Sequence, residues 1–373
     1  MYKSIKNWDR HAADGIRVSE PLFPAASSFS TEATLSVCPK YQRYGFRFYG
    51  SASEYFGIWM VNLMLTIVTL TLYSPWVKAR RMRYFYGNTQ FLNHRFDFVA
   101  MPSRILLGRL FALELYLVTV VLTNYSILAT SSLLMVAALC LPWLIRMTLK
   151  FKARNSKYGN VRFYFNGSNR EAYRVLFLAI LINIFTLLLF SPVMIWLYKR
   201  YCFNHLSIGQ LQFKLNINWS KFMSAVYLPF GLCLLVGIGW LAAVVYWVDR
   251  IGTNLFSLGL LLSYLLCLAL VWPIISARLY IITWNHVELG QSYFKTRVTT
   301  WRYSWIVLSN WMIRVLSLGL MTPWAVIRLY EYQLKHLELY VVDDETDLKH
   351  ILQPDPSALA DEILDVFDFD ASL

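Results

Sequence analysis

The chain has 373 residues, of which 57% are hydrophobic and only 15% are charged. Soluble globular proteins carry about 25% charged residues, so this composition excludes an ordinary soluble protein and indicates that a bilayer surrounds much of the chain. The net charge of +13 is uneven, because residues 343–373 hold 10 acidic side chains and one lysine, while residues 1–342 hold 34 basic and 12 acidic side chains.

The basic side chains lie beside apolar segments, which is typical of cytoplasmic loops that face anionic lipid head groups. The partners that the charge predicts are therefore the lipid bilayer and its anionic head groups. Nucleic acid is not expected as a partner, because the basic residues do not gather on a free face of a soluble domain.

Seven apolar segments follow a polar tail at residues 1–43. Each has about 18 to 27 residues, enough at 1.5 Å per residue to span or nearly span a hydrocarbon core about 30 Å thick. The short connections at 123–126 and 249–254 force two pairs of segments into antiparallel hairpins. The segments lie at about 55–75, 105–123, 127–145, 173–197, 222–248, 255–276 and 303–328.

The pattern around the first segment returns twice, displaced by 117 and by 248 residues. It opens with FRFYGS, crosses an apolar run, breaks at a Ser-Pro pair and continues as a basic, aromatic run. Serine or threonine before proline predicts that a new helix begins at each break. The residues that define the repeats are Gly50, Ser74, Pro75, Gly167, Ser191, Pro192, Thr322 and Pro323.

The order FRFYGS, EYFGIWMVNLMLTIVTLTLYSPW and KARRMRYFYGNT resembles the YjgN-like family of bacterial inner-membrane proteins, a domain of unknown function. The resemblance covers roughly residues 44–342. It departs from the family pattern in the third copy, which lacks the aromatic-glycine-serine opening and the asparagine-threonine pair. The resemblance implies a polytopic inner-membrane protein and no established activity.

The sequence therefore predicts an all-α polytopic membrane protein with about seven hydrophobic helical segments, built from three related repeat segments and two helical hairpins. One short strand or extended edge is expected at Phe46 and Phe48, where hydrophobic residues alternate. The predicted divisions are an N-terminal tail at 1–43, repeat segments at 44–104, 160–221 and 292–342, hairpins at 105–159 and 222–291, and an acidic C-terminal tail at 343–373.

Two signals disagree about the topology. The hairpin tips at Asn124 and Asn254 carry little charge, so the positive-inside rule places both tips in the periplasm and the C-terminus in the cytoplasm. The segment at 173–197 would then enter and leave on the cytoplasmic side. If that segment crosses fully, one tip must be cytoplasmic despite its composition. Straight helices are far commoner than re-entrant ones, which favours seven full crossings.

Two ionisable side chains inside apolar segments are candidates for a functional site. Glu114 lies about ten residues into the second segment, and Arg314 of the last segment is its best candidate partner. Ionisable groups inside a membrane normally face the protein interior and have a partner. The two side chains therefore form either a proton or cation site or a structural ion pair.

Further polar side chains lie in the repeat segments: Asn62, Thr66, Asn183 and Asn310. Thr66, Asn183 and Arg314 occupy one position of the repeat. They would converge if the repeats pack about a common axis, and the alternative is ordinary hydrogen bonding between helices.

Nothing in the sequence indicates a metal, a cofactor or a catalytic residue. His205 and His336 occupy the position of Asn88 in the first copy, but no further ligands stand at a metal-like spacing. The five cysteines require neither a disulfide nor a zinc site. An enzyme is not expected, because the sequence has no phosphate-binding loop, nucleophile elbow or paired-carboxylate motif.

Two classes of function stay open. The first is a transporter, channel or lipid-handling protein, which predicts a cavity reaching Glu114 or Arg314. The second is a non-transporting membrane scaffold that recruits an unidentified protein partner or a second copy of the chain. The scaffold predicts a sealed core in which Glu114 and Arg314 pair with each other.

Overall fold

The structure is a computed structural model that describes residues 41–251 and 253–342. Within these residues, one order of elements recurs five times: a strand, a helical hairpin and a second strand. The predicted tails lie outside the described residues, except for residues 41–43. The five units are β1 (Gln42–Phe48), α1 (Ala52–Val68), α2 (Ser74–Gly87) and β2 (Thr89–Phe91); β3 (His94–Phe98), α3 (Pro102–Tyr125), α4 (Ile127–Arg154) and β4 (Ser156–Tyr158); β5 (Val161–Phe165), α5 (Asn169–Phe185), α6 (Ser191–Asn204) and β6 (Leu206–Ile208); β7 (Leu211–Leu215), α7 (Trp219–Ile251), α8 (Thr253–Trp284) and β8 (Val287–Leu289); and β9 (Ser292–Thr296), α9 (Thr300–Leu316), α10 (Thr322–Lys335) and β10 (Leu337–Val341).

The strands of the described residues form a closed antiparallel barrel. Each strand pairs with its neighbours along the chain, and β10 pairs with β1 to close the barrel. In this register Phe46 of β1 lies opposite Phe91 of β2, and Phe96 of β3 lies opposite Tyr158 of β4. Every helical hairpin therefore starts and ends at the same barrel.

The prediction of an all-α protein is wrong. The strands are three to seven residues long and occupy the polar connections between apolar segments. A strand of three residues is too short to show an alternating pattern. One of its two pairing partners follows directly after a tight turn, but the other lies at the far end of a helical hairpin. Of these strands, the sequence indicated only the one that contains Phe46 and Phe48.

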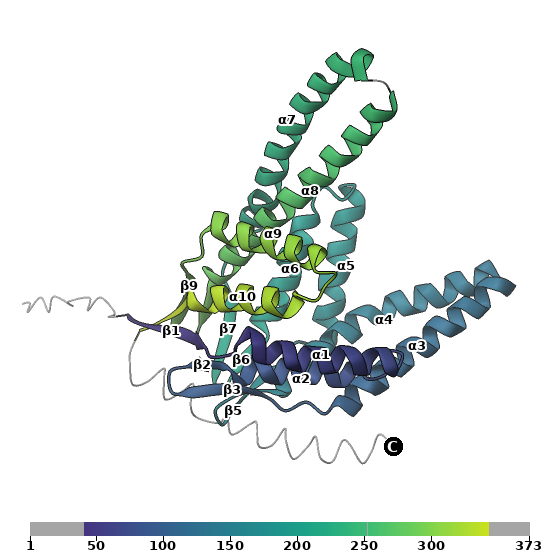
Figure 1. The fold of residues 1–373 in the computed structure, drawn as a ribbon. Coiled ribbons are helices and arrows are strands. Elements are labelled where there is room, and N and C mark those ends of the chain that lie inside the picture. The colour runs from purple at the N-terminus through teal and green to yellow at the C-terminus, as the bar shows by residue number, and fades with distance from the viewer. Residues whose placement is uncertain (1–40, 252, 343–373) are drawn as a thin grey trace, which may run out of the picture. The chain divides into compact units, whose positions relative to one another are not determined.

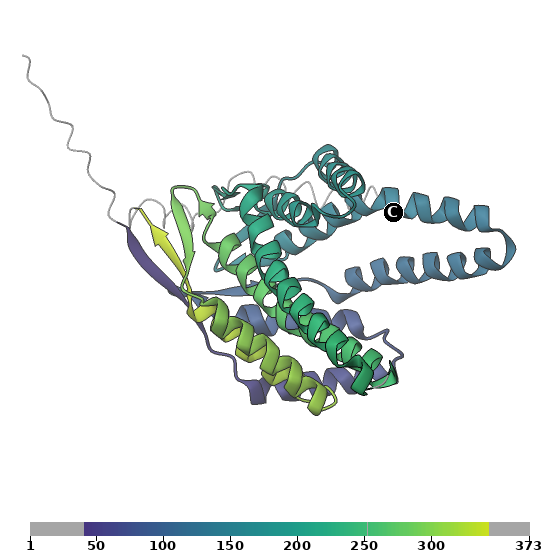
Figure 2. The ribbon, with the colours of Figure 1, turned by 90° about the horizontal axis from the view of Figure 1, so that it is seen from above.

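The helices form a second ring, adjacent to the barrel. Consecutive helices contact one another along the chain, and α10 contacts α1, so this ring also closes. Figure 1 shows the hairpins leaving the strands, and Figure 2 shows the same arrangement after a quarter turn. Hairpins α3–α4 and α7–α8 are longer than the other three, since α4 and α8 have 28 and 32 residues and α2 has 14.

The second helix of each hairpin contains a proline, and the place of this proline differs between short and long hairpins. Helices α2, α6 and α10 begin one residue before their prolines, whereas α4 and α8 run through theirs. The predicted helix starts at Ser74, Ser191 and Thr322 are therefore confirmed, although none of these side chains caps its helix. The five prolines are Pro75, Pro142, Pro192, Pro273 and Pro323.

The prediction of about seven single helical segments is also wrong. Segments 55–75, 173–197 and 303–328 are each divided between two antiparallel helices. Among the described residues, three helices are long and apolar enough to cross a membrane, and two shorter helices are apolar. The three are Ile127–Arg154, Trp219–Ala242 and Ser257–Trp284, and the shorter two are Ala52–Val68 and Leu110–Tyr125.

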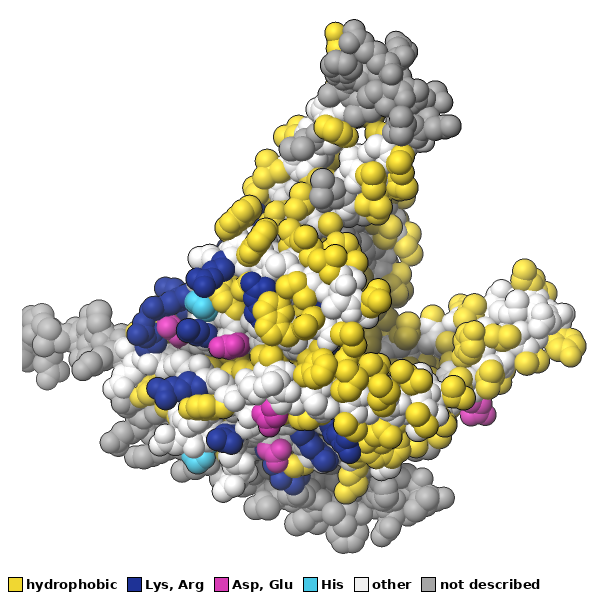
Figure 3. All heavy atoms as spheres, viewed as in Figure 1, with side chains coloured by type: hydrophobic (Ala, Val, Ile, Leu, Met, Phe, Trp, Pro, Cys, Tyr) yellow, Lys and Arg dark blue, Asp and Glu magenta, His cyan; other side chains and the backbone are white. Residues whose placement is uncertain are grey.

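Hydrophobic side chains cover the outer surface of the helical hairpins. In Figure 3 they extend over the hairpins away from the strands, while Lys and Arg side chains gather near the barrel. Phe177, Phe185 and Trp301 are 69 to 80% exposed. Exposed apolar surface on this scale indicates contact with lipid or with another protein.

Candidate functional site

A cavity of about 840 Å³ lies inside the two rings. Its walls come from α2, α4, α6, α8 and α10, the second helices of the five hairpins, and from side chains inside the barrel. No first helix of a hairpin contributes to the described lining. Met82, Phe85 and Tyr86 of α2 show how each wall is built, because their spacing of three to four residues places them on one face of the helix.

Five phenylalanines form the floor of the cavity. One comes from each of the longer strands β1, β3, β5, β7 and β9. The centroids of successive rings lie 6.1 to 6.5 Å apart around the closed circle, and the planes of successive rings differ by 17 to 25°. The five are Phe46, Phe96, Phe163, Phe213 and Phe294.

A second apolar layer supports this phenylalanine ring. Phe91 stacks on Phe46 with the ring centroids 4.6 Å apart, and Tyr158 packs on Phe96 at 4.9 Å. Ile208, Leu289 and Leu339 are the strand partners of the other three phenylalanines, and all are buried. All five of these side chains line the cavity together with the five phenylalanines, so the open volume extends from the helices into the barrel.

Basic side chains stand among the apolar walls. Lys78, Arg81 and Lys152 line the cavity, and none of the described lining residues is acidic. The Arg81 guanidinium carbon lies 5.9 Å from the centroid of the Phe85 ring. The positive charge that Arg81 and Lys152 bring to this lining favours an anionic group in the cavity.

A further lysine lies beside the cavity wall. Lys199 of α6 donates a hydrogen bond from Nζ to Oγ1 of Thr283 of α8, at 2.8 Å. Burial lowers the pKa of Lys199, and burial raises the pKa of the neighbouring Cys202 thiol. The charges of Lys152 and Lys199 oppose that increase at Cys202, so two ammonium groups from different helices lie near one point of the cavity.

Asparagine or histidine ends each second helix at the barrel. Asn88 and Asn155 donate from Nδ2 to the carbonyl four residues earlier, at 3.0 and 2.7 Å. The Nδ1 atoms of His205, His286 and His336 make the same contact at 2.8 to 2.9 Å. These histidines therefore cap helix ends and fix where the cavity walls meet the barrel.

The Gly-Ser pairs of the repeats fix the entry into the first helix of a hairpin. Ser168 and Glu171 form a capping box at the start of α5. Gly167 precedes them, and an added Cβ there would lie 2.7 Å from both the Phe165 ring and the Tyr201 hydroxyl. Only glycine fits between these rings and the helix start. The same crowding at Gly50 accounts for glycine at this place in the first and third units.

The first and fifth units each contain a buried asparagine that accepts a hydrogen bond from an arginine of the second helix. Arg80 donates from Nη1 to Asn62 Oδ1 at 3.3 Å, and Arg328 donates to Asn310 Oδ1 at 3.4 Å. Thr66 donates to the backbone carbonyl of Asn62 at 2.7 Å. These predicted polar residues hold the two helices of their own hairpins together and do not line the cavity.

The other predicted site residues do not converge. Glu114 is exposed on α3, and among the described residues no ion pair joins it to Arg314. Asn183 donates from Nδ2 to the carbonyl of Ala179, while Asn183 Oδ1 and Arg314 Nε are buried without a hydrogen-bond partner. Neither Glu114 nor Arg314 lines the cavity.

The cavity was not predicted from the sequence, although one signal for its floor was present. Phe163 follows Asn155 by eight residues and Phe294 follows Asn285 by nine, as Phe96 follows Asn88 by eight. This spacing marks the passage from a second helix into the barrel. Asn155 and Asn285 lie in the predicted hairpins, outside the three predicted repeat segments. No comparable signal predicted that five phenylalanines would meet.

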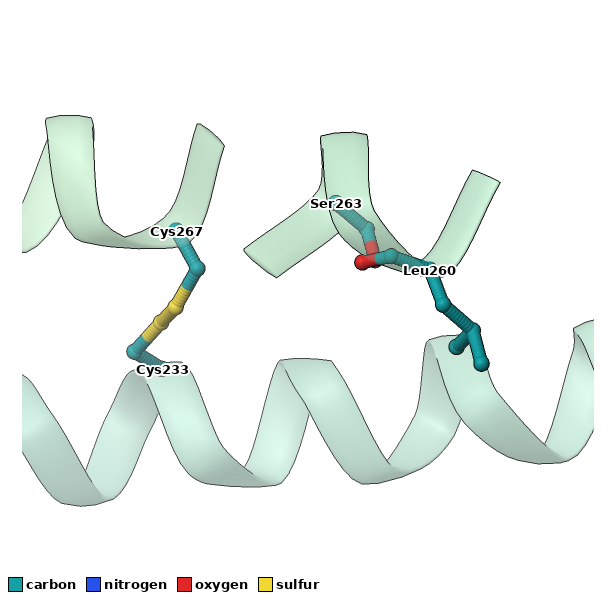
Figure 4. The surroundings of a disulfide bond; sticks show 4 residues. All are labelled: Cys233, Leu260, Ser263 and Cys267. Atoms are coloured by element: carbon teal, nitrogen blue, oxygen red, sulfur yellow. A yellow bond between two sulfur atoms is a disulfide. The ribbon is translucent and has the colours of Figure 1, made fainter. Parts of the chain in front are cut away.

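The structure also corrects the expectation that no disulfide is needed. Cys233 of α7 and Cys267 of α8 are joined by a disulfide (Figure 4). Ser263 lies one turn before Cys267 on α8 and donates from Oγ to the carbonyl of Leu260 at 2.8 Å. The disulfide links the two helices of the longest hairpin, away from the described cavity lining.

Two curated relatives are named inner membrane protein YjgN. The relative from Escherichia coli strain K12 is 29% identical over 135 residues, which are 36% of this chain and 34% of that protein. The relative from Salmonella typhimurium strain LT2 is 26% identical over 210 residues, or 56% of this chain and 48% of that protein. The chain thus matches about a third to a half of the length of these relatives.

No solved structure matches the chain. A family model described as bacterial protein of unknown function (DUF898) matches residues 43–366. This match and the two relatives confirm the resemblance that the first repeat indicated. The chain belongs to the DUF898 family of bacterial proteins of unknown function.

Proposed function

We propose that this chain is a multi-pass protein of the bacterial inner membrane that binds an anionic lipid in its central cavity. The observation that carries the proposal is the combination of apolar walls with Arg81 and Lys152 in a cavity of about 840 Å³. Pockets of about 300 to 1,000 Å³ suit small ligands, and apolar walls with a few polar groups are typical of them.

The two chemical parts of the site suit the two parts of a lipid. Arg81 and Lys152 come from different helices and would bind the phosphate of the head group. The phenylalanine ring and the apolar helix faces would contact acyl chains. The cavity does not reach Glu114 or Arg314 as the sequence led us to expect, but its open volume favours lipid handling over a scaffold, which requires a sealed core.

The placement in the membrane follows from charge and length. The outer face of the barrel carries exposed basic side chains such as Arg95 and Lys214, which by the positive-inside rule supports a cytoplasmic barrel and, with it, a cytoplasmic C-terminus. The five units would be internal repeats, of which the first, third and fifth keep the clearest sequence similarity. Their shared positions for proline and for the helix-ending asparagine or histidine support this reading.

Native mass spectrometry of the purified protein with phosphatidylglycerol and with phosphatidylcholine tests the proposal. The wild type should bind the anionic lipid more tightly. The double variant Arg81→Gln/Lys152→Gln should lose about tenfold or more of that affinity, because charge-assisted hydrogen bonds contribute roughly 1.5 to 3 kcal/mol.

The matched control is Arg95→Gln/Lys214→Gln, which removes one arginine and one lysine from the outer face of the barrel. It should leave the affinity for the anionic lipid unchanged. The proposal fails if both lipids bind equally well to the wild type. It fails also if the cavity variant and the control variant behave alike.

A further inference from the structure

The three short hairpins, α1–α2, α5–α6 and α9–α10, end in the same tip. After the first helix of each hairpin, two successive residues take left-handed backbone conformations. The first of these two residues is a leucine in all three hairpins, and its side chain is exposed. In α5–α6 these two residues are Leu187 and Leu188, with φ of 48° and 66°. Leu70, Leu187 and Leu318 are 83, 89 and 95% exposed.

Backbone amides at these tips are satisfied within the tip itself. In α5–α6, all six amides from Thr186 to Ser191 donate hydrogen bonds, five to backbone carbonyls and that of Phe190 to the Thr186 hydroxyl. The equivalent amides 69–74 and 317–322 show the same pattern, with Thr69 and Ser317 supplying the hydroxyl. A turn in water has no need of such closure, because water can pair with its amides.

Internal pairing of every tip amide together with exposed leucines is what a turn in hydrocarbon needs of its hydrogen-bond donors. In a bilayer core an unpaired backbone group costs several kcal/mol, so irregular backbone must satisfy its own hydrogen bonds. The tip of α3–α4 differs, since its sequence Thr-Asn-Tyr-Ser is polar and Ser126 begins the next helix as an ordinary N-cap. That composition suits the head-group region or water.

The helix lengths give the depth of the short tips. All second helices end at the barrel, so α2, with 14 residues, reaches about 21 Å from it, whereas α4, with 28 residues, reaches about 42 Å. Measured along the helices, the short hairpins thus end about 20 Å nearer to the barrel than α3–α4 does. A hydrocarbon core is about 30 Å thick, so the short tips end inside it when the long hairpins cross.

We infer that the three short hairpins are re-entrant: they enter the bilayer from the barrel side, end among lipid acyl chains and return to the barrel. Their apolar surface is continuous with that of the candidate spans, because α5 contacts α4 and α9 contacts α8. Only α3–α4 and α7–α8 then cross the membrane, and both of their tips lie on the side opposite the barrel. This inference stands without the proposed lipid site.

Single cysteines placed at Asn124 and at Leu187 test the inference. Each is treated with a membrane-impermeant thiol reagent from the outside in whole cells and from the inside in inverted vesicles, and the labelling of the parent protein is subtracted. Asn124→Cys should react from the side opposite the barrel, while Leu187→Cys should react from neither side. A fluorophore placed at residue 187 with a membrane-permeant reagent should be quenched by lipids that carry a spin label in the middle of the acyl chain.

Reaction of Leu187→Cys with the impermeant reagent from either side would overturn the inference, as would quenching only by lipids labelled at the head group. Leu318→Cys in α9–α10 repeats the test in an independent hairpin. If both cysteines are protected from the impermeant reagent, the result reflects re-entry of the hairpins and not a local change of structure caused by one substitution. A loss of lipid affinity in the cavity variants has no bearing on either result.

Discussion

The hydroxyl oxygen of Tyr84 accepts a hydrogen bond from the amide of Ser51 at 2.9 Å, across the hairpin formed by α1 and α2. The same hydroxyl lies 3.0 Å from the carbonyl of Ser51. The contact holds the start of α1 against α2 near the barrel. It also leaves no space for a side chain at Gly50, where a Cβ would lie 3.0 Å from the Tyr84 oxygen and closer still to the Phe48 ring.

Gly50→Ala should therefore destabilise the protein by about 1 to 3 kcal/mol, as overpacked sites do. The Phe48 ring cannot move away freely, because it packs on Phe85 and Tyr330. The control is Gly57→Ala in α1, where an added Cβ meets nothing within 4 Å. Thermal unfolding in detergent should show a lower Tm for Gly50→Ala and an equal or higher Tm for the control. Equal Tm values for the two variants would contradict the packing account.

The capping box of α5 predicts a pH dependence of stability. The backbone amide of Ser168, and then its hydroxyl, hold the pKa of Glu171 below its ordinary value of 4.5. The carboxylate therefore stabilises the fold above about pH 4.5, and this contribution is lost as the pH falls through the lower pKa of the folded state. Glu171→Gln should cost a few tenths to about 1 kcal/mol at pH 7, because the side chain is partly exposed.

The measurement is the difference in Tm between Glu171→Gln and the wild type at pH 7 and at pH 3.5. The difference should shrink at the lower pH, where the wild-type carboxylate becomes protonated. Glu331→Gln, which changes an exposed carboxylate on α10, should show little difference at either pH. A constant deficit for Glu171→Gln across this range would exclude a role for its charge.

The pairs of a buried asparagine with an arginine predict that a second substitution restores part of the stability lost with the first. At the place of Asn310 and Arg328 the third unit has Ala179 and Leu197, which are both buried. Asn310→Ala alone should cost about 1 to 3 kcal/mol, because it leaves the partly buried Arg328 without one of its acceptors. The double variant Asn310→Ala/Arg328→Leu should recover part of that loss. Chemical unfolding of the single and double variants measures the coupling, and strictly additive losses would show that the pair does not act as a unit.

The phenylalanine ring predicts a large cost of truncation inside the barrel. Phe163→Ala should destabilise the protein by about 2 to 3 kcal/mol, less than at a fully buried site, because Phe163 packs between two neighbouring rings but also faces the cavity. Phe163→Leu should cost less, since it keeps most of the apolar volume. Phe56→Ala, on the partly exposed face of α1, should change the stability in detergent little. Equal costs at residues 56 and 163 would mean that the ring is not part of the folded core.

The sequence predicted the helices far better than the strands, and the reason is physical. Ser74-Pro75 marks the start of α2 through chemistry within two residues, and the polar run at 123–126 forces a hairpin by its length alone. The barrel instead depends on pairing between the two strands that flank each helical hairpin, such as β7 with β8, and on the pairing of β1 with β10 from opposite ends of the described chain. Strands of three residues carry too little pattern to reveal that pairing.

The candidate site was hidden for a related reason. Glu114 and Arg314 attract attention because a charge inside an apolar segment is unusual, but the charges that line the cavity stand near the ends of second helices, as Lys152 does. There a lysine looks like part of a basic loop. Its direction, into the ring rather than toward the cytoplasm, depends on closure of the barrel by β1 and β10.

The most direct test of lipid binding in the cavity is a structure of the protein purified with phosphatidylglycerol that carries bromine near the ends of its acyl chains. Bromine density inside the barrel-side cavity, against the phenylalanine ring, with the phosphate near Arg81 and Lys152, is the expected result. Bromine density confined to the outer faces of the helices, with the cavity filled only by water or by side chains, would contradict the account.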